Sequence, residues 1–441
     1  MSRPDVPPGP AAGETLAFVE SPVQLLNVLE WVYEDRLRSQ DARDPRTPLS
    51  PPASGGDAPR GAAVLPGAGP HPGAAEARSG ISAPTSFPGG EAARGADVLL
   101  GIGARPGPPA EARSDPAAPA GGVTVVVLSP NDPMTRGQLR RMAELAREEG
   151  LTVRWEDARG GPAAPFHTIG ALAPAVRRAR RIVIGDPFSR YVQLLLTLAR
   201  ARELVVVDDG TATMEFVSQL ARGERLVRWH RSGRGGGPRD AVFAPVSAVA
   251  RRRLTPREGH RSVEVFSSMP VEPPAGVLVT PNDFAWTRAR FGPPALTGGA
   301  DLVGTSLAET GVVDLDRYVG AVTALARAHG ATRYFAHRRE NTDKLHRLAV
   351  ETGLEIVRPD LPLELIARRG PIGRTIVSFP STVVHTLPLA LAGTDVKVAV
   401  CDIDPAWLTD TASPRAQGFL SGVTGTARDV HRLSSVPAAA P

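Results

Sequence analysis

Three polar motifs in this sequence stand beside stretches that have the pattern of strands: Asp208-Asp209-Gly210, His337 and Ser381-Thr382. The first follows a β-branched run at residues 203–207, which reads as a short buried strand. In open parallel sheets, ligands bind in the crevice beyond the carboxyl ends of the strands. The three motifs are therefore candidates for one ligand site.

The adjacent carboxylates of Asp208 and Asp209 permit three interpretations. They could act as a general base, they could bind a metal, or they could only cap the helix that follows, as acids often do. The stretch by itself leaves all three open.

The other two motifs suit a phosphate. Ser381 and Thr382 at a helix start offer hydroxyls and backbone N–H groups. His337 could protonate a departing phosphate or stabilise its charge. Together with a carboxylate base across a cleft, they describe an inverting transfer from an activated phosphate ester. Singly, His337 could be a surface histidine and Ser381-Thr382 an ordinary helix cap, but the ordered combination favours chemistry.

Strand and helix patterns alternate along the chain. The expected strands are residues 15–20, 123–128, 151–155, 181–185, 203–207, 263–266, 302–304, 333–336, 354–357, 375–379 and 397–400. The expected helices are residues 23–38, 135–149, 171–180, 188–201, 212–220, 314–329, 342–352, 363–369 and 382–392. This alternation predicts an α/β fold with parallel sheets in two halves around a cleft.

The predicted domain boundaries follow the composition. Residues 1–38 supply the first strand and helix of an N-terminal domain, and residues 122–290 supply the rest. Between them, residues 39–121 are rich in Pro, Gly and Ala and lack apolar periodicity, so we expect a disordered insertion. Residues 301–408 form a C-terminal domain, and residues 409–441 form a C-terminal segment with a loose tail.

The composition of the 441 residues favours a cytoplasmic protein. The single cysteine, Cys401, excludes an internal disulfide and fits a reducing compartment. The start of the chain lacks a signal-peptide pattern, and no apolar run has the length of a membrane span.

The net charge of +5 comes largely from arginine. The densest basic clusters are Arg177, Arg178, Arg180 and Arg181, followed by residues 251–253. Neither has interleaved aromatics, so we expect no nucleic-acid partner and interpret both as solvated helix faces. A basic surface would also suit an anionic substrate or peripheral contact with the inner face of an anionic membrane.

In these motifs the chain resembles the bacterial sialyltransferases of the GT-B architecture, particularly the lipooligosaccharide sialyltransferase and polysialyltransferase group. Those families carry an acid-acid-Gly motif, a His-Pro motif and a Ser-Ser or Ser-Thr pair, in that order. The resemblance also touches residues 21–27, 185–189, 304–309 and 363–366. It spans most of the chain outside the insertion and the tail.

The resemblance implies a GT-B-like fold, with two Rossmann-type domains whose parallel sheets face each other across a cleft. It implies that Asp208 or Asp209, with Asp209 favoured, is the general base toward the acceptor hydroxyl. His337 would then act on the phosphate of the CMP leaving group as an acid or charge stabiliser, and Ser381 and Thr382 would hydrogen-bond that phosphate.

The resemblance also implies further donor contacts. Glu364 would hold the ribose or base of the nucleotide, and Gly304-Thr305 would lie along it. Family members need no metal for chemistry, so we expect neither a metal site nor a cofactor. One departure is His337-Arg338 in place of His-Pro: proline would stiffen the turn, whereas Arg338 adds a cation that could assist the phosphate.

The expected function is therefore inverting, metal-independent transfer of sialic acid from a CMP-activated donor to a glycan acceptor, as in capsule or lipooligosaccharide biosynthesis. One alternative is a non-catalytic nucleotide-sugar or glycan-binding protein on the same scaffold, and another is a transferase for a different activated sugar. A metal-dependent phosphate-ester hydrolase is less favoured, because it needs more acids or histidines at strand ends than His337 provides.

Overall fold

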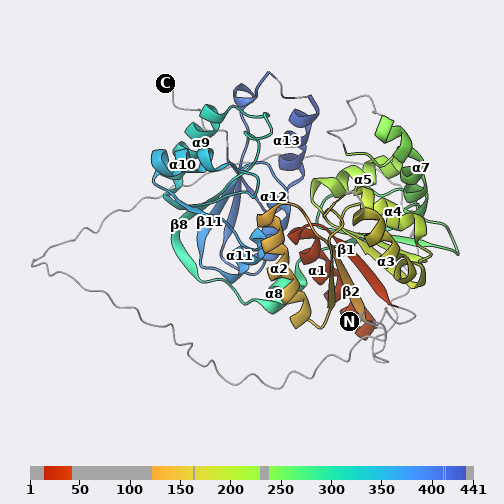
Figure 1. Cartoon of the computed structure of the whole chain (residues 1–441). Coiled ribbons are helices and arrows are strands. Elements are labelled where there is room, and N and C mark those ends of the chain that lie inside the picture. The colour runs from red at the N-terminus through yellow and green to blue at the C-terminus, as the bar shows by residue number, and fades with distance from the viewer. Residues whose placement is uncertain are drawn as a thin grey trace, which may run out of the picture. The chain divides into compact units, whose positions relative to one another are not determined.

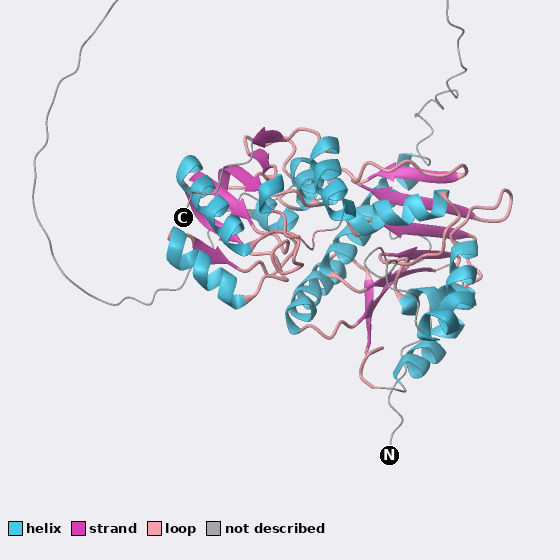
Figure 2. Cartoon of the chain, turned by 90° about the horizontal axis from the view of Figure 1, so that it is seen from above, coloured by secondary structure: helices cyan, strands magenta, loops and turns pink. Residues whose placement is uncertain are grey.

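The structure is a computed structural model that describes residues 14–41, 122–161, 164–228, 238–410, 412 and 414–433. These residues form two parallel sheets, each covered by helices on both faces (Figures 1 and 2). The expected α/β class with two Rossmann-like halves is confirmed. The predicted insertion lies outside the described residues, except that residues 39–41 end helix α1 (Pro22–Asp41).

The N-terminal sheet has the strand order β3-β2-β1-β4-β5-β6-β7, and all its pairings are parallel. Its strands are β1 (Thr15–Val19), β2 (Val123–Leu128), β3 (Thr152–Glu156), β4 (Arg181–Ile184), β5 (Glu203–Val207), β6 (Ser262–Ser267) and β7 (Val277–Pro281). Strands β2 and β3 follow β1 on one side of it, and β4 to β7 follow on the other side. This change between β1 and β4 is the topological switch point of a Rossmann sheet.

The C-terminal sheet repeats this order as β10-β9-β8-β11-β12-β13, again with parallel pairings only. Its strands are β8 (Leu296–Val303), β9 (Ala331–Phe335), β10 (Glu355–Val357), β11 (Ile372–Ser378), β12 (Lys397–Cys401) and β13 (His431–Leu433). Its switch point lies between β8 and β11.

Alternation along the buried strands assigns the helices to faces, because successive side chains point to opposite sides of a sheet. Leu16 and Phe18 of β1 pack in one apolar cluster, and Ala17 and Val19 pack in another. The first cluster lies under α3 (Ala164–Arg178), α4 (Arg190–Leu198), α5 (Thr211–Ala221) and α7 (Pro238–Arg253). The second lies under α1, α2 (Pro133–Glu148) and α8 (Ala285–Arg290).

The helices of the C-terminal sheet divide in the same way. One face packs against α9 (Leu315–His329) and α10 (Thr342–Thr352). The other packs against α11 (Leu363–Arg369) and α12 (Val383–Ala390), and Val423 of α13 (Pro414–Thr426) joins Val384 of α12.

Five elements were not among the predicted ranges: α7, β7, α8, α13 and β13. Helix α8 has only six residues, too few to show a helical period, and its start is held by a partner far along the chain. Helix α13 and strand β13 fall in the segment after residue 408, to which the sequence assigned no element. The three residues of β13 depend on pairing with β12, so no local pattern marks them. The predicted tail at residues 434–441 lies outside the described residues.

The helix layers of the two sheets meet around α8, which contacts α1, α11 and α12. Leu365 and Ala390 of the C-terminal half belong to the same apolar cluster as β1. The buried carboxylate of Glu30 accepts hydrogen bonds from the backbone N–H groups of Trp286 (2.8 Å) and Thr287 (3.0 Å) at the start of α8. Burial raises the pKa of Glu30 to about 7. No helix of the described ranges is long and apolar enough to cross a membrane.

Candidate active site

The N-terminal switch point is surrounded by carboxylates. Strand β1 leads into Glu20, β4 leads through a glycine into Asp186, and the neighbouring β5 leads into Asp208 and Asp209. Because the strands are parallel, these residues share the carboxyl edge of the sheet.

The motifs that were predicted to bind the donor phosphate and nucleotide lie around the C-terminal switch point. Strand β8 leads into Gly304 and Thr305, β11 leads into the loop that carries Ser381 and Thr382, and β9 leads into His337. All three predicted motifs therefore lie at the carboxyl edges of the two sheets.

Asp208 is part of the framework. Its side chain is almost fully buried, and it accepts hydrogen bonds from the backbone N–H of Gly210 (3.1 Å) and from the N–H (3.1 Å) and hydroxyl (2.9 Å) of Ser268. Its backbone oxygen accepts a bond from the amide of Asn27 (2.8 Å). With its lone pairs engaged in this way, Asp208 fixes the end of β5 and the turn that follows.

Asp209 is the carboxylate that remains suited to proton transfer. Its side chain is 16% exposed, so it is accessible but largely removed from water. Burial raises the pKa of Asp209 to about 7 and the negative charge of Asp186 adds to the increase, while Arg228, Arg338 and a hydrogen bond from Gln24 oppose it. A carboxyl group with a pKa near 7 is well matched to general-base catalysis near neutral pH.

Arg228 links Asp209 to a second carboxylate that the sequence prediction missed. Its guanidinium lies 2.6 Å from Asp186 Oδ2 and 3.8 Å from Asp209 Oδ2. Asp186 also accepts a bond from the N–H of Phe188 (2.8 Å), so it is tied down on both oxygens. Asp186 could have been found as a strand-end acid, whereas Arg228 lies in a stretch without a readable pattern.

Glu20 completes the acidic group on this edge. Its carboxylate pairs with Arg159 (2.7 Å) and accepts a hydrogen bond from the Ser189 hydroxyl (2.5 Å). Burial raises the pKa of Glu20, against the effect of Arg159. Among the described residues, no group of three or more His, Cys, Asp or Glu side chains has the arrangement of a metal site.

The two edges meet where Gly210 faces Thr382. A Cβ atom on Gly210 would lie 2.7 Å from the Thr382 methyl group, and the φ of +65° at Gly210 also disfavours any other residue. Thr382 stands at the cap position of α12, yet its side chain makes no capping hydrogen bond. The hydroxyls of Ser381 and Thr382 thus lie at the N-terminus of α12. Thr382 approaches Gly210, which is the residue that follows Asp209 in the chain.

His337 is neutral in this structure. Burial lowers its pKa to about 4, with further contributions from Arg338, Arg339 and Lys344. Its Nδ1 accepts a hydrogen bond from the backbone N–H of Arg339 (3.2 Å), which leaves the proton on Nε2. His337 is therefore arranged to offer one N–H donor, from Nε2, while Nδ1 is engaged by the Arg339 backbone.

A buried charged network holds the His337 loop. Glu340 accepts a hydrogen bond from the backbone N–H of His337 (2.6 Å) and pairs with Lys344 (2.8 Å), and both side chains are almost fully buried. Lys344 also pairs with Glu309 (3.3 Å) and donates to the carbonyl oxygen of Thr305 (2.9 Å). The network therefore connects His337 to the loop after β8.

Gly304 is required by the same network. A Cβ atom at this position would overlap the Glu340 carboxylate and the Tyr334 hydroxyl. The next residue, Thr305, is mostly buried, and its backbone N–H donates to the Tyr318 hydroxyl (3.3 Å). The loop after β8 is thus fixed close to the sheet edge.

Glu364 and Arg338 lie in different surroundings. The Glu364 carboxylate is buried, accepts a bond from the Thr386 hydroxyl (2.6 Å) and has its pKa raised by burial, so the structure places it between α11 and α12. Arg338 is exposed, and its positive charge opposes the rise in the pKa of Asp209 that burial and Asp186 cause. Of the residues predicted to bind the donor, Arg338 is the one whose charge acts on the pKa of Asp209.

No family model and no curated protein sequence matches this chain. Solved structures do match. An α/β-galactoside α-2,3-sialyltransferase from the luminous marine bacterium Photobacterium phosphoreum matches with 10% identity and a TM-score of 0.39, over 71% of this chain and 91% of that one. The E. coli heptosyltransferase WaaC matches with ADP-2-deoxy-2-fluoro heptose (14% identity, TM-score 0.32, 72% and 84% covered) and with ADP (15%, 0.30, 70% and 90%).

Proposed function

We propose that this protein is an inverting glycosyltransferase that moves a sugar, sialic acid from CMP-sialic acid, to a hydroxyl group of a glycan. The observation that carries the proposal is the position of Asp209. Its carboxylate has a raised pKa, and the next residue in the chain, Gly210, approaches Thr382 of the other domain. Asp209 of one domain thus stands near Ser381 and Thr382 of the other, and in our proposal Asp209 is the base and the two hydroxyls hold the phosphate. The motif resemblance to bacterial sialyltransferases supplies the donor.

In the proposed reaction Asp209 takes the proton of the acceptor hydroxyl. The acceptor oxygen forms a new bond to the anomeric carbon from one side, while the bond from that carbon to the phosphate oxygen of CMP breaks on the other side. One displacement inverts the anomeric configuration. The electron pair of the broken bond leaves with the CMP phosphate, and the proton remains on Asp209.

The departing phosphate is stabilised by the C-terminal edge. Ser381 and Thr382 would donate hydroxyl hydrogen bonds at the N-terminus of α12, where backbone N–H groups favour an anion. His337 would donate through Nε2 as a neutral imidazole, and this hydrogen bond would strengthen as negative charge develops on the departing phosphate. Arg338 would add positive charge at the same place.

The remaining donor contacts follow the resemblance. Gly304-Thr305 would lie along the nucleotide, and Glu364 would reach its ribose or base once the α11 and α12 ends adjust. We propose that no metal is needed, because Arg338 and His337 provide the charge stabilisation that a divalent ion would otherwise supply.

A pocket lies beside the ends of strands β2 and β3 in the N-terminal domain. This pocket of about 430 Å³ is lined by Ser129, Trp155 and Asp157, which end or follow strands β2 and β3 on the same edge as Asp209, and by arginines of α2. An aromatic face with polar and cationic neighbours suits a sugar chain. We propose that acceptor residues beyond the reacting one lie in this pocket.

The pH dependence should identify the base. The rate constant kcat/KM reports groups of the free enzyme, so we expect it to rise with pH through about 7 as Asp209 loses its proton. The pKa of His337 is about 4, so this residue stays neutral above pH 5 and produces no further change up to pH 9. Initial rates measured from pH 5 to 9 at low donor concentration test this expectation. A profile that is flat through pH 7 would contradict it.

The direct test of function is release of CMP from CMP-sialic acid, with and without EDTA. We expect EDTA to leave the rate unchanged, Ser381→Ala to weaken CMP binding, and His337→Ala to lower turnover by about 100-fold, the usual loss when a donor to a developing anion is removed. His346→Ala is the matched control, because His346 is an exposed histidine of α10 in the same domain.

Two other results would reassign the protein. Binding of CMP without consumption of any donor, even by hydrolysis, would indicate a nucleotide-sugar-binding protein on the same scaffold. Turnover of a different nucleotide sugar but not of CMP-sialic acid would keep the transferase mechanism and change the donor.

A further inference from the structure

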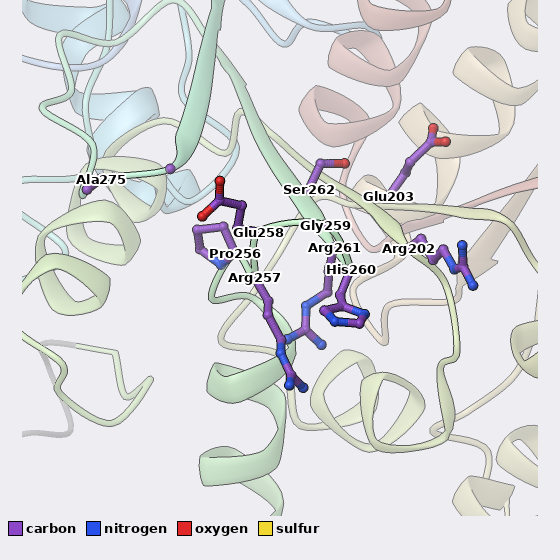
Figure 3. A pocket seen from close by; sticks show the side chains of 11 residues that line it. Arg202, Glu203, Pro256, Arg257, Glu258, Gly259, His260, Arg261, Ser262 and Ala275 are labelled. Carbon is purple, nitrogen blue, oxygen red and sulfur yellow. The ribbon is translucent and has the colours of Figure 1, made fainter.

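A second pocket, of about 710 Å³, opens at the opposite edge of the N-terminal sheet (Figure 3). It is lined by residues that precede strands β5, β6 and β7, including Arg202, the loop at residues 256–261, and Gly276. The five residues of β5 separate this edge from Asp209, a distance of about 17 Å. The pocket is therefore separate from the candidate active site.

Three basic side chains gather on one side of this pocket. Arg257, His260 and Arg261 extend in the same direction from their loop, as Figure 3 shows. Burial lowers the pKa of Arg261, and the charges of Arg253 and Arg257 lower it further. Repulsion among neighbouring cations is a cost that a bound anion would remove.

The carboxylates at the pocket do not neutralise this group. Glu203 is occupied on its other side by ion pairs with Arg180 (3.1 Å) and Arg181 (2.6 Å). Glu258 points away from Arg257 and Arg261 in Figure 3. Within the described ranges, no carboxylate lies at ion-pair distance from Arg257 or Arg261.

The loop that presents these cations is held in a defined turn. The backbone N–H of Arg257 donates to the oxygen of Arg261 (2.9 Å), and the N–H of Arg261 donates back to Arg257 (2.8 Å). Gly259, with a φ of +67°, closes the turn. The backbone positions of Arg257 and Arg261 are therefore fixed opposite each other, and the Arg261 side chain also donates from Nε to the carbonyl oxygen of Thr255 (3.3 Å).

The two arginine clusters noted in the sequence also lie at this edge, where the strands of the N-terminal sheet begin. Helices run back across a parallel sheet, so their last turns lie beside the starts of the strands. The last turn of α3 carries Arg177 and Arg178, the last turn of α7 carries residues 251–253, and Arg181 begins β4. A favourable interaction with helix dipoles accounts for cations in last turns, but it does not account for Arg257 and Arg261, which lie in a loop.

We propose that this pocket is a binding site for a phosphate-type oxyanion, held by Arg257 and Arg261 with His260 beside them. The planar guanidinium fork matches two oxygens of a phosphate, so two arginines on one turn suit a phosphate or diphosphate group. Such a group occurs on free nucleotides and diphosphates and also on anionic lipid headgroups, and the experiment separates the two sources.

The test compares the full chain with the double variant Arg257→Ala/Arg261→Ala. A control double variant, Arg327→Ala/Arg374→Ala, removes the same charge from exposed positions of the C-terminal domain. Pyrophosphate binding is measured by calorimetry. Cosedimentation is measured with vesicles of phosphatidylglycerol in phosphatidylcholine and with vesicles of phosphatidylcholine alone. The variant Arg257→Gln/Arg261→Gln keeps a polar, uncharged side chain at both positions and replaces the alanine pair if that pair folds poorly.

We expect the pocket variant to bind at least about tenfold more weakly than the wild type, because it lacks both guanidinium groups that would bind the anion. The control should bind like the wild type. Saturable pyrophosphate binding that the pocket variant loses assigns the site to free phosphates. Loss confined to phosphatidylglycerol vesicles assigns it to lipid headgroups. Absence of binding to both probes, or equal binding by the pocket variant, overturns the proposal. No cleft residue is changed, so the result does not depend on the transferase proposal.

Discussion

Replacement of Asp209 by asparagine is expected to lower turnover of the donor by about a thousandfold while the protein stays folded. Asparagine keeps the shape of the side chain but cannot accept the acceptor's proton, and removal of a general base typically costs 10² to 10⁴ in rate, so about a thousandfold. The measurement is kcat for CMP release at pH 8, where Asp209 of the wild type is ionised.

The same variant should be more stable than the wild type at neutral pH. The pKa of Asp209 is 3.8 when unfolded and about 7 when folded, so ionisation opposes folding. The penalty is absent below pH 4, grows as the pH rises toward 7 and is complete above it. The gain in unfolding free energy of Asp209→Asn should follow this course, which denaturant titrations at pH 4, 6 and 8 would show.

Asp208→Asn is the matched control for Asp209→Asn. Asp208 accepts bonds from Gly210 and Ser268, so its amide form leaves a buried donor group facing other donors. We expect a loss of about 1–3 kcal/mol in unfolding free energy. Full stability of Asp208→Asn together with loss of turnover, and normal turnover of Asp209→Asn, would exchange the two assigned roles.

Replacement of Lys344 by methionine is expected to destabilise the protein by about 3–5 kcal/mol. Methionine fills a similar volume but leaves the buried carboxylate of Glu340 without its cation, and an uncompensated buried charge typically costs this much. Because Glu340 also holds the backbone of His337, turnover should fall as well. Guanidinium unfolding curves measure the first effect, and CMP release measures the second.

Two further variants make this result specific. Arg347→Met removes a cation from the same helix, but Arg347 pairs at the surface with Glu351, so its loss should cost less than about 1 kcal/mol. Lys344→Met combined with Glu340→Gln removes both charges and should recover part of the stability. If Lys344→Met unfolds like Arg347→Met, the network does not hold the His337 loop.

Much of the scaffold was predictable from local pattern. Strand β2 and helices α10 and α11 have the predicted bounds, because β-branched runs and capped amphipathic periods are properties of neighbouring residues. The predicted motifs lie at strand ends for the same reason. A strand that ends in polar residues delivers them to the carboxyl edge of a parallel sheet, whatever the order of the strands.

The sequence by itself therefore determined the two α/β halves and which residues stand at their edges. Only the tertiary structure separated Asp208 from Asp209, because Ser268 and Asn27, which engage Asp208, come from distant parts of the chain. It also brought Gly210 to Thr382 and Arg228 to Asp186. Burial, charge pairing and contact across domains depend on residues far apart in sequence. These interactions decide whether a carboxylate is engaged in holding the end of a strand, as Asp208 is, or remains suited to proton transfer, as Asp209 is.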